Sequence, residues 1–264
     1  MKRWIPFMKS DPVVSVVRLN GMIASGPRGL SDDGIAPVLE KAFSRGKPKA
    51  VAIVVNSPGG SPVQSSLIGA RIRRLAQEKE IPVYAFVEDV AASGGYWLAS
   101  AADEIWLDQA SVVGSIGVIS AGFGLHELIE KHGIQRRVYT AGKSKSMLDP
   151  FRPEKTEDVE RLKRILEQIH QVFIDHVQSR RANKLPEDQD MFTGEIWVGE
   201  KAVDVGLAEG IGHLVPKMKE VFGDKVRLVP YGPRRSFLQR FGANVVGDMV
   251  HGIEERAQFA RFGL

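Results

Sequence analysis

The chain of 264 residues contains no cysteine. This absence excludes a disulfide-stabilised scaffold, a cysteine nucleophile, a zinc site with cysteine ligands and an iron–sulfur cluster. Long apolar runs are also missing, because the longest spans residues 50–55, whereas a membrane-spanning helix needs about 18–20 apolar residues. The excess of positive charge is small, with 36 Lys and Arg against 32 Asp and Glu. Without aromatic residues interleaved among the basic ones, this excess predicts no nucleic-acid partner.

Motifs for cofactors are absent as well. No two of the six histidines have the i, i+4 spacing of a helical zinc site. The sequence Gly142-Lys143-Ser144 lacks the glycine that a phosphate-binding loop has five residues earlier. We therefore expect neither a metal ion nor an organic cofactor. A Ser-His-Asp triad stays open, although nothing in the sequence marks a histidine as a partner of a serine.

The amino-terminal residues begin like a signal peptide, with Lys2 and Arg3, but no apolar segment follows them. We therefore expect the chain to stay in the cytoplasm, where it is made. The alternative is a peripheral position on the inner face of the membrane, through Trp4 and Phe7.

Short apolar runs alternate with amphipathic stretches along the chain. The run at residues 50–55 is continuous and rich in β-branched residues, which is typical of a strand buried on both faces of a parallel sheet. This alternation predicts an α/β fold with a mostly parallel sheet and flanking helices. The predicted strands are residues 13–19, 50–55, 81–87, 104–107, 116–120, 137–140 and 225–230. The predicted helices are residues 32–44, 63–79, 93–101, 125–132, 154–182, 201–205, 215–221 and 236–262.

The length fits one or two domains, and no linker or repeat divides the chain. We predict an N-terminal tail at residues 1–12, one domain at 13–232 and a C-terminal amphipathic helix at 233–264. Apolar residues from Leu238 to Ile253 form one stripe of that helix. We interpret the stripe as a packing surface within or between subunits. Contact with a membrane surface is the alternative, because several arginines lie nearby.

Two glycine-rich turns follow predicted strands. Residues 56–60 have the sequence Asn-Ser-Pro-Gly-Gly, and Ser93 and Gly94 open the helix after the next strand. Ligands bind at this edge of open α/β sheets, and the N–H groups of Gly59, Gly60 and Gly94 suit an oxyanion. Ser93 is then a candidate nucleophile beside a helix N-terminus. The alternatives are an ordinary turn and a serine that caps its helix.

A serine nucleophile needs a base. Lysine can serve when its surroundings lower its pKa from about 10.4 towards neutrality. The segment at residues 140–150 offers Lys143 and Lys145. A basic surface loop is the alternative, and for Lys143 it is the interpretation we adopt.

Four motifs, taken in order, resemble the signal peptide peptidase A/SohB family of Ser–Lys serine peptidases. The resemblance extends from about residue 13 to residue 215 and implies a Clp-protease/crotonase-like fold. The motifs are Asn-Ser-Pro-Gly-Gly at 56–60, Ala-Ser-Gly-Gly-Tyr at 92–96, Val-Gly-Ser-Ile-Gly-Val at 113–118 and Gly-x-x-Lys at 142–145.

The resemblance assigns each role to one position of this sequence. It implies Ser93 as the nucleophile, Lys145 as the general base and Ser115 as the side chain that orients the lysine. Gly94 and the turn at residues 59–60 match the family's oxyanion hole. Cleaved signal peptides and other unfolded or membrane-derived peptides are the implied substrates. The family's pockets favour small and apolar side chains.

Two departures from the family pattern shape the remaining expectations. Members are commonly anchored by an N-terminal helix, and its absence here favours cytosolic peptides as substrates. The family's tandem form supplies serine and lysine from different halves of one chain. A chain of single length therefore implies a ring-shaped homo-oligomer in which Ser93 of one subunit meets Lys145 of a neighbour.

Two other functions stay open beside the peptidase. An acyl-CoA enzyme of the crotonase fold also uses paired N–H groups as an oxyanion hole. A non-catalytic oligomeric scaffold would bind peptides without cleaving them. Neither function needs a serine and a lysine in these positions, so Ser93 and Lys145 favour the peptidase.

Overall fold

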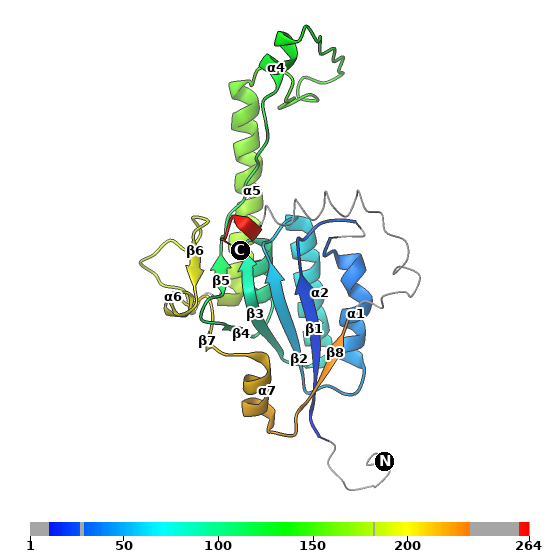
Figure 1. Cartoon of the computed structure of the whole chain (residues 1–264), viewed down its shortest axis with the longest axis vertical. Helices are drawn as coiled ribbons and strands as arrows, with labels where there is room; N and C mark the ends of the chain where they lie inside the picture. The colour runs from blue at the N-terminus through cyan, green and yellow to red at the C-terminus, as the bar shows by residue number, and fades with distance from the viewer. Residues whose placement is uncertain (1–10, 27–28, 182, 233–258, 264) are drawn as a thin grey trace.

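The computed structural model describes residues 11–26, 29–181, 183–232 and 259–263 (Figure 1). An eight-stranded sheet has the strand order β6-β5-β3-β2-β1-β8, with β4 paired to β3 and β7 paired to β4. Among the described strands, only the β5–β6 pair is antiparallel. The strands are β1 (Val13–Asn20), β2 (Ala50–Ser57), β3 (Val83–Ala92), β4 (Glu104–Leu107), β5 (Val112–Gly114), β6 (Ile196–Val198), β7 (Gly210–Ile211) and β8 (Arg227–Tyr231).

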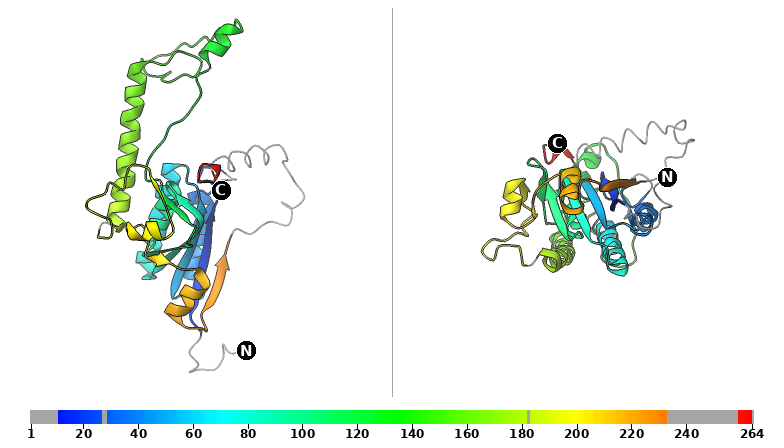
Figure 2. Two further views of the ribbon diagram at one scale, coloured as in Figure 1. Left: turned by 60° about the vertical axis from the view of Figure 1, so that its left-hand side comes forward. Right: turned by 90° about the horizontal axis from the view of Figure 1, so that it is seen from below.

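Helices cover both faces of this sheet. Three long helices, α1, α2 and α5, lie on one face, and α7 lies on the other (Figure 2). Ile53 of β2 belongs to the core beneath the first group, and its neighbour Val54 packs with Met218 of α7. Burial on both sides explains the unbroken apolar run of β2. The helices are α1 (Asp32–Ser44), α2 (Pro62–Lys79), α3 (Gly94–Ser100), α4 (His126–Lys131), α5 (Thr156–Arg181), α6 (Glu200–Asp204) and α7 (Leu214–Phe222).

Local sequence sets where α1 and α2 begin. Ser31 caps α1 by accepting a hydrogen bond from the Gly34 N–H. Ser61 caps α2 in the same way, and Pro62 occupies the first position of that helix, where its missing N–H costs nothing. The cap of α2 directly follows the glycine turn after β2, so it also fixes how the chain leaves that turn.

Helix α5 extends beyond the sheet. Its buried residues, Phe173, Val177 and Arg181, all belong to its second half. The first half leads to residues 120–155, here called the arm, which project away from the sheet together with α4 (Figures 1 and 2). Helix α4 has no buried residue. The arm therefore makes little contact with the rest of its own chain.

The structure confirms the predicted α/β fold with a mostly parallel sheet, but two predicted strands are wrong. Residues 116–120 leave the sheet, because Ser115 has a φ of 50° and turns the chain away after β5. Residues 137–140 lie in the arm, where no described strand runs beside them. Alternating apolar residues do not make a strand without a neighbour that satisfies its backbone hydrogen bonds.

Three short strands escaped prediction. β5, β6 and β7 contain three, three and two residues, too few to show alternation in the sequence. β3 also continues to Ala92, past the predicted end at residue 87, with a register irregularity against β2. The predicted C-terminal helix at 236–262 falls almost entirely outside the described residues.

One histidine of α5 makes the stability of the fold depend on pH. His176 stacks on Trp97 with ring centroids 4.8 Å apart, and its Nε2 lies 3.0 Å from Ser100 Oγ. Burial lowers the pKa of His176 to about 4, whereas an unfolded histidine has a pKa of about 6.5. The unfolded chain therefore binds more protons between these values, and stability falls as pH decreases from about 6.5 to about 4.

We expect His176→Gln to remove this dependence. The slope of the unfolding free energy against pH should decrease by up to about 1.4 kcal/mol per pH unit in this range. Urea unfolding of wild type and variant at several pH values measures the difference. Equal slopes for the two proteins would contradict the prediction.

Candidate active site

Several hydrogen bonds fix the glycine turn through which the chain leaves β2. The buried Ser57 hydroxyl donates to the Gly21 carbonyl at 2.7 Å and accepts from the Gly59 N–H at 3.2 Å. Gly59 and Gly60 have φ angles of 102° and 141°, which residues with side chains rarely adopt. A Cβ at Gly60 would lie 2.0 Å from the carbonyl oxygen of Ile23. The turn therefore requires glycine, because its backbone runs directly against a neighbouring segment.

Ser93 lies between β3 and α3 with a φ of 51° and a ψ of −120°. Its N–H donates to the Gly114 carbonyl of β5 at 2.8 Å, and its side chain makes no capping hydrogen bond to α3. The structure thus gives no support to the capping role that was the alternative for this serine. A left-handed backbone is strained for a residue with a side chain, and such strain concentrates at functional sites.

The turns at Gly59 and Ser93 are in contact. A Cβ on Gly59 would lie 2.9 Å from the Gly94 nitrogen and 2.9 Å from Ser93 Cβ, and a Cβ on Gly94 would lie 3.4 Å from the Gly60 nitrogen. Within the described part of the chain, neither the Gly60 N–H nor the Gly94 N–H has an acceptor. Such N–H groups beside a serine suit the negatively charged oxygen of a tetrahedral intermediate. The Gly59 N–H, which we expected to share this role, donates to Ser57 Oγ instead.

Pairing of β3 with β5 brings a second serine to the same edge of the sheet. The register places Ala92 opposite Gly114, so Ser93 and Ser115 follow the carboxyl ends of adjacent parallel strands. The Ser115 N–H donates to the Glu195 carbonyl at 2.6 Å. Both serines line one cavity of about 460 Å³. The same cavity is lined by Gly59, Gly60 and Gly94.

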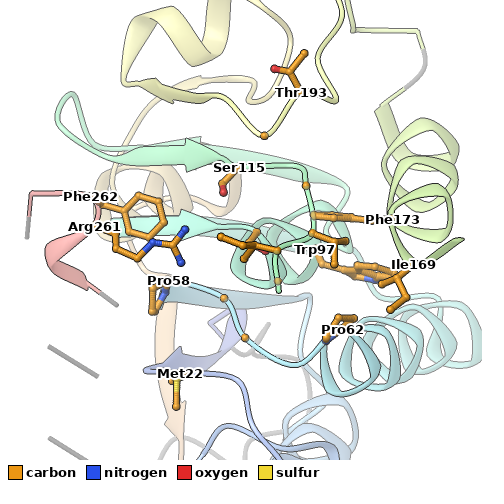
Figure 3. A pocket seen from close by; sticks show the side chains of 18 residues that line it. Met22, Pro58, Pro62, Trp97, Ser115, Ile169, Phe173, Thr193, Arg261 and Phe262 are labelled. Atoms are coloured by element: carbon orange, nitrogen blue, oxygen red, sulfur yellow. The ribbon is translucent and has the colours of Figure 1, made fainter. Parts of the chain in front are cut away.

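One wall of this cavity is apolar (Figure 3). Trp97 of α3 and Ile169 and Phe173 of α5 form it, and the Trp97 and Phe173 rings stack with centroids 4.8 Å apart. These residues were not predictable as part of a site, because apolar side chains at helical spacing are as typical of a core as of a binding site. Arg261 and Phe262 line the cavity on the opposite side, and the sequence did not predict them there either (Figure 3).

Lys145 does not line this cavity. It lies in an exposed turn of the arm, where its N–H donates to the Gly142 carbonyl at 3.2 Å. The segment between α4 and α5 lies at the far end of the projection from the sheet (Figures 1 and 2). Within one chain, the structure brings Ser93, Ser115 and the three glycines together and holds Lys145 away from them.

Other chemistry finds little support in the parts of the chain that the structure describes. No histidine there lines the cavity, so nothing favours the Ser-His-Asp triad that the sequence left open. Residues 11–26, 29–181, 183–232 and 259–263 contain no cluster of three or more His, Asp or Glu that would hold a metal ion. None of the helices formed by these residues has both the length and the hydropathy of a membrane span.

The contact between the two turns predicts different costs for two glycine substitutions. Gly46 also has a left-handed φ, of 75°, but no atom lies within 4 Å of the position that a Cβ would take. Gly46→Ala should therefore lower the free energy of unfolding only by the backbone strain, about 1–2 kcal/mol. Gly59→Ala should cost at least about 2 kcal/mol more, because its Cβ would also collide with backbone atoms. Urea unfolding measures both, and equal costs would contradict the contact.

Comparison with known proteins finds a family and relatives that match the part of the chain containing Ser93 and Ser115. Peptidase family S49 matches residues 75–221. The chloroplastic serine protease SPPA of Arabidopsis thaliana is 32% identical over 89% of this chain and 37% of that protein. The probable protease SohB of Haemophilus influenzae is 30% identical over 87% of this chain and 64% of that protein.

A further relative has a different name. The Na(+)/H(+) antiporter NhaA of Brucella melitensis is 46% identical over 100% of this chain, but the match covers 39% of that protein. The chain thus spans less than half the length of this relative and of the Arabidopsis protease.

A solved structure has the same fold. It is a mutant of the 1510-N membrane-bound stomatin-specific protease in complex with a substrate peptide. The likeness has a TM-score of 0.52 at 14% identity and covers 92% of this chain and 100% of that chain. It confirms the predicted Clp-like α/β fold.

Proposed function

The chain belongs to peptidase family S49, and from this premise we propose that it is a serine endopeptidase with Ser93 as its nucleophile. The observation that carries the proposal is the contact between the two turns. It sets a strained serine, whose hydroxyl caps nothing, beside the acceptor-free N–H groups of Gly60 and Gly94. These groups open onto a cavity large enough for several side chains of a peptide.

The proposed reaction has two steps. The Lys145 amine takes the proton of the Ser93 hydroxyl as the serine oxygen attacks a peptide carbonyl, and the N–H groups of Gly60 and Gly94 stabilise the oxyanion. The lysine then protonates the leaving amine, and an acyl-enzyme remains. A water molecule gives a proton to the same lysine and attacks the ester; the lysine then returns that proton to the Ser93 oxygen as the acid leaves, which restores both the serine and the lysine amine. The Ser115 hydroxyl orients the lysine amine throughout.

In this proposal a neighbouring copy of the chain supplies Lys145. The arm supports this, because the segment between α4 and α5 projects away from the sheet (Figure 1) and its Lys145 does not line the cavity that contains Ser93. Large apolar side chains of the arm are also more than half exposed, which is typical of an interface between proteins. If each arm contacts the next copy in the same way and the rotation between copies closes, the assembly is a ring. These exposed side chains are Phe123 (84%), Leu128 (54%), Ile134 (59%) and Tyr139 (91%).

Unfolded peptides with small or apolar side chains are the proposed substrates, signal-peptide remnants among them. The apolar wall formed by Trp97, Ile169 and Phe173 supports this class. A peptide as the substrate also agrees with the solved structure of similar fold, which contains a substrate peptide. We place the reaction in the cytoplasm, including the inner face of the membrane, as part of the same proposal.

Ion transport is not proposed, although one relative is named as an antiporter. The match to that relative covers 39% of its length. Residues 75–221 of this chain match a peptidase family instead.

Complementation between two inactive variants tests both the dyad and the shared site. Ser93→Ala and Lys145→Ala should each lower the rate of casein hydrolysis by at least about 10³-fold. Lys143→Ala, a matched change in the same arm segment, should stay close to wild type. Equimolar co-assembly of the two inactive variants should restore about one quarter of the wild-type rate, because each site takes its serine and its lysine from different chains.

Each other outcome contradicts a specific part of the proposal. A mixture that stays inactive after verified exchange of subunits would place serine and lysine in one chain. Full activity of Ser93→Ala would remove the catalytic assignment and return the acyl-CoA enzyme and the peptide-binding scaffold to consideration.

The arm surface leads to a second test of the assembly. Phe123→Asp should lower the mass seen in sedimentation and reduce hydrolysis, because it places a charge in the proposed contact. Its unfolding free energy per chain should stay within about 0.5 kcal/mol of wild type, since the residue is exposed. Val221→Asp on α7, 42% exposed, is the matched control and should change neither mass nor rate. An unchanged assembly in Phe123→Asp would contradict the arm contact.

A further inference from the structure

A segment of the chain itself lies in the candidate active site. Residues 259–263 reach the cavity that contains Ser93, and Arg261 and Phe262 form part of its lining. They lie on the side opposite Phe173, and the Arg261 guanidinium extends towards the middle of the cavity (Figure 3). These residues are more than a hundred positions from the serine in the sequence.

The surface beneath this segment is an apolar patch near the carboxyl ends of β3 and β5. Val90 and Ala92 of β3 and Val112 of β5 form it, and Phe259 and Phe262 pack against them. The two strands of the patch are those that end at Ser93 and Ser115, so the patch adjoins both serines.

This patch faces away from the large helices. Ala91 belongs to the core beneath α1 and α2, so alternation along β3 directs Val90 and Ala92 to the opposite face. On that face Met218 of α7 packs with a different group of residues, which includes Phe86. Among the residues that the structure describes, the cover over the patch comes from Phe259 and Phe262.

We propose that this patch is a subsite for an aromatic side chain of a peptide substrate, and that Phe262 occupies it as an intramolecular competitor. The inference rests on the proposed peptidase function and adds the kind of side chain that is bound beside Ser93. The Val and Ala side chains of the patch offer an apolar surface on which an aromatic ring can lie flat. A substrate ring placed there would bury apolar area next to Ser93.

Competition follows from the shared position. Phe262 and an aromatic side chain of the substrate cannot occupy the patch together, so a peptide places such a side chain there only in the fraction of molecules from which Phe262 has moved away. Because the segment is tethered, its effective concentration is high. Removing the Phe262 contact should therefore strengthen peptide binding roughly tenfold, about the effect expected from burial of one aromatic ring.

Binding measured without catalysis tests the inference independently of the proposed reaction. In the Ser93→Ala background, the probe is a short fluorescein-labelled peptide with one phenylalanine, compared with the same peptide carrying alanine there. Phe262→Asp and a deletion of residues 259–264 should each lower the Kd for the phenylalanine peptide roughly tenfold and change the Kd for the alanine peptide little. Val221→Asp on α7 is the control and should leave both Kd values unchanged.

A second readout uses the enzyme with Ser93 intact. There Phe262→Asp should lower KM for the phenylalanine peptide and leave kcat nearly unchanged, because the change affects access to the site and not the chemistry. Unchanged Kd and KM in both the substitution and the deletion would overturn the inference and leave the proposed peptidase intact. Stronger peptide binding in a protein that cleaves nothing would uphold the subsite and contradict the proposed function.

Discussion

The rest of the site depends on one contact, between the backbone turn after β2 and the turn after β3. No side chain fits between them, because a Cβ on Gly59 would lie 2.9 Å from the Gly94 nitrogen and from Ser93 Cβ. The parallel pairing of the two strands brings their carboxyl ends together, and the glycines allow the last approach. The strained φ of Ser93 and the acceptor-free N–H groups follow from this packing.

Helix α5 joins this centre to the arm. Its second half packs on α3, the helix that begins directly after Ser93, through stacking of Trp97 on Phe173. One turn earlier, His170 Nε2 lies 3.1 Å from the carbonyl oxygen of Ile116, next to Ser115. The first half of α5 carries the arm. Helix α5 thus extends from the wall of the cavity, where Ile169 and Phe173 lie, to the arm that contains Lys145.

The buried strands and the two glycine-rich turns could be predicted from the local sequence. Continuous β-branched runs indicated buried parallel strands, and the glycine-rich turns after them made Gly59, Gly60, Ser93 and Gly94 candidates. The local pattern left an ordinary turn and a capping serine open, and the resemblance to a peptidase family assigned the roles. The apolar wall was not predictable, since Phe173 in a helical stripe looks like a core residue. The position of the segment at 259–263 depends on long-range packing with β3 and β5, which no local pattern encodes.

Cross-linking through introduced cysteines tests directly whether the site is shared between subunits. Because the chain has no cysteine of its own, the introduced thiols are the only ones that react. Chains with Ser93→Cys and chains with Lys145→Cys are co-assembled and treated with a short bifunctional thiol reagent, and denaturing electrophoresis then separates the products. A cross-linked pair of chains should form in the mixture and not in either variant alone. A double variant, diluted to single chains, should give no cross-link within one chain. An efficient cross-link within that diluted chain, with none in the mixture, would contradict a site built from two subunits.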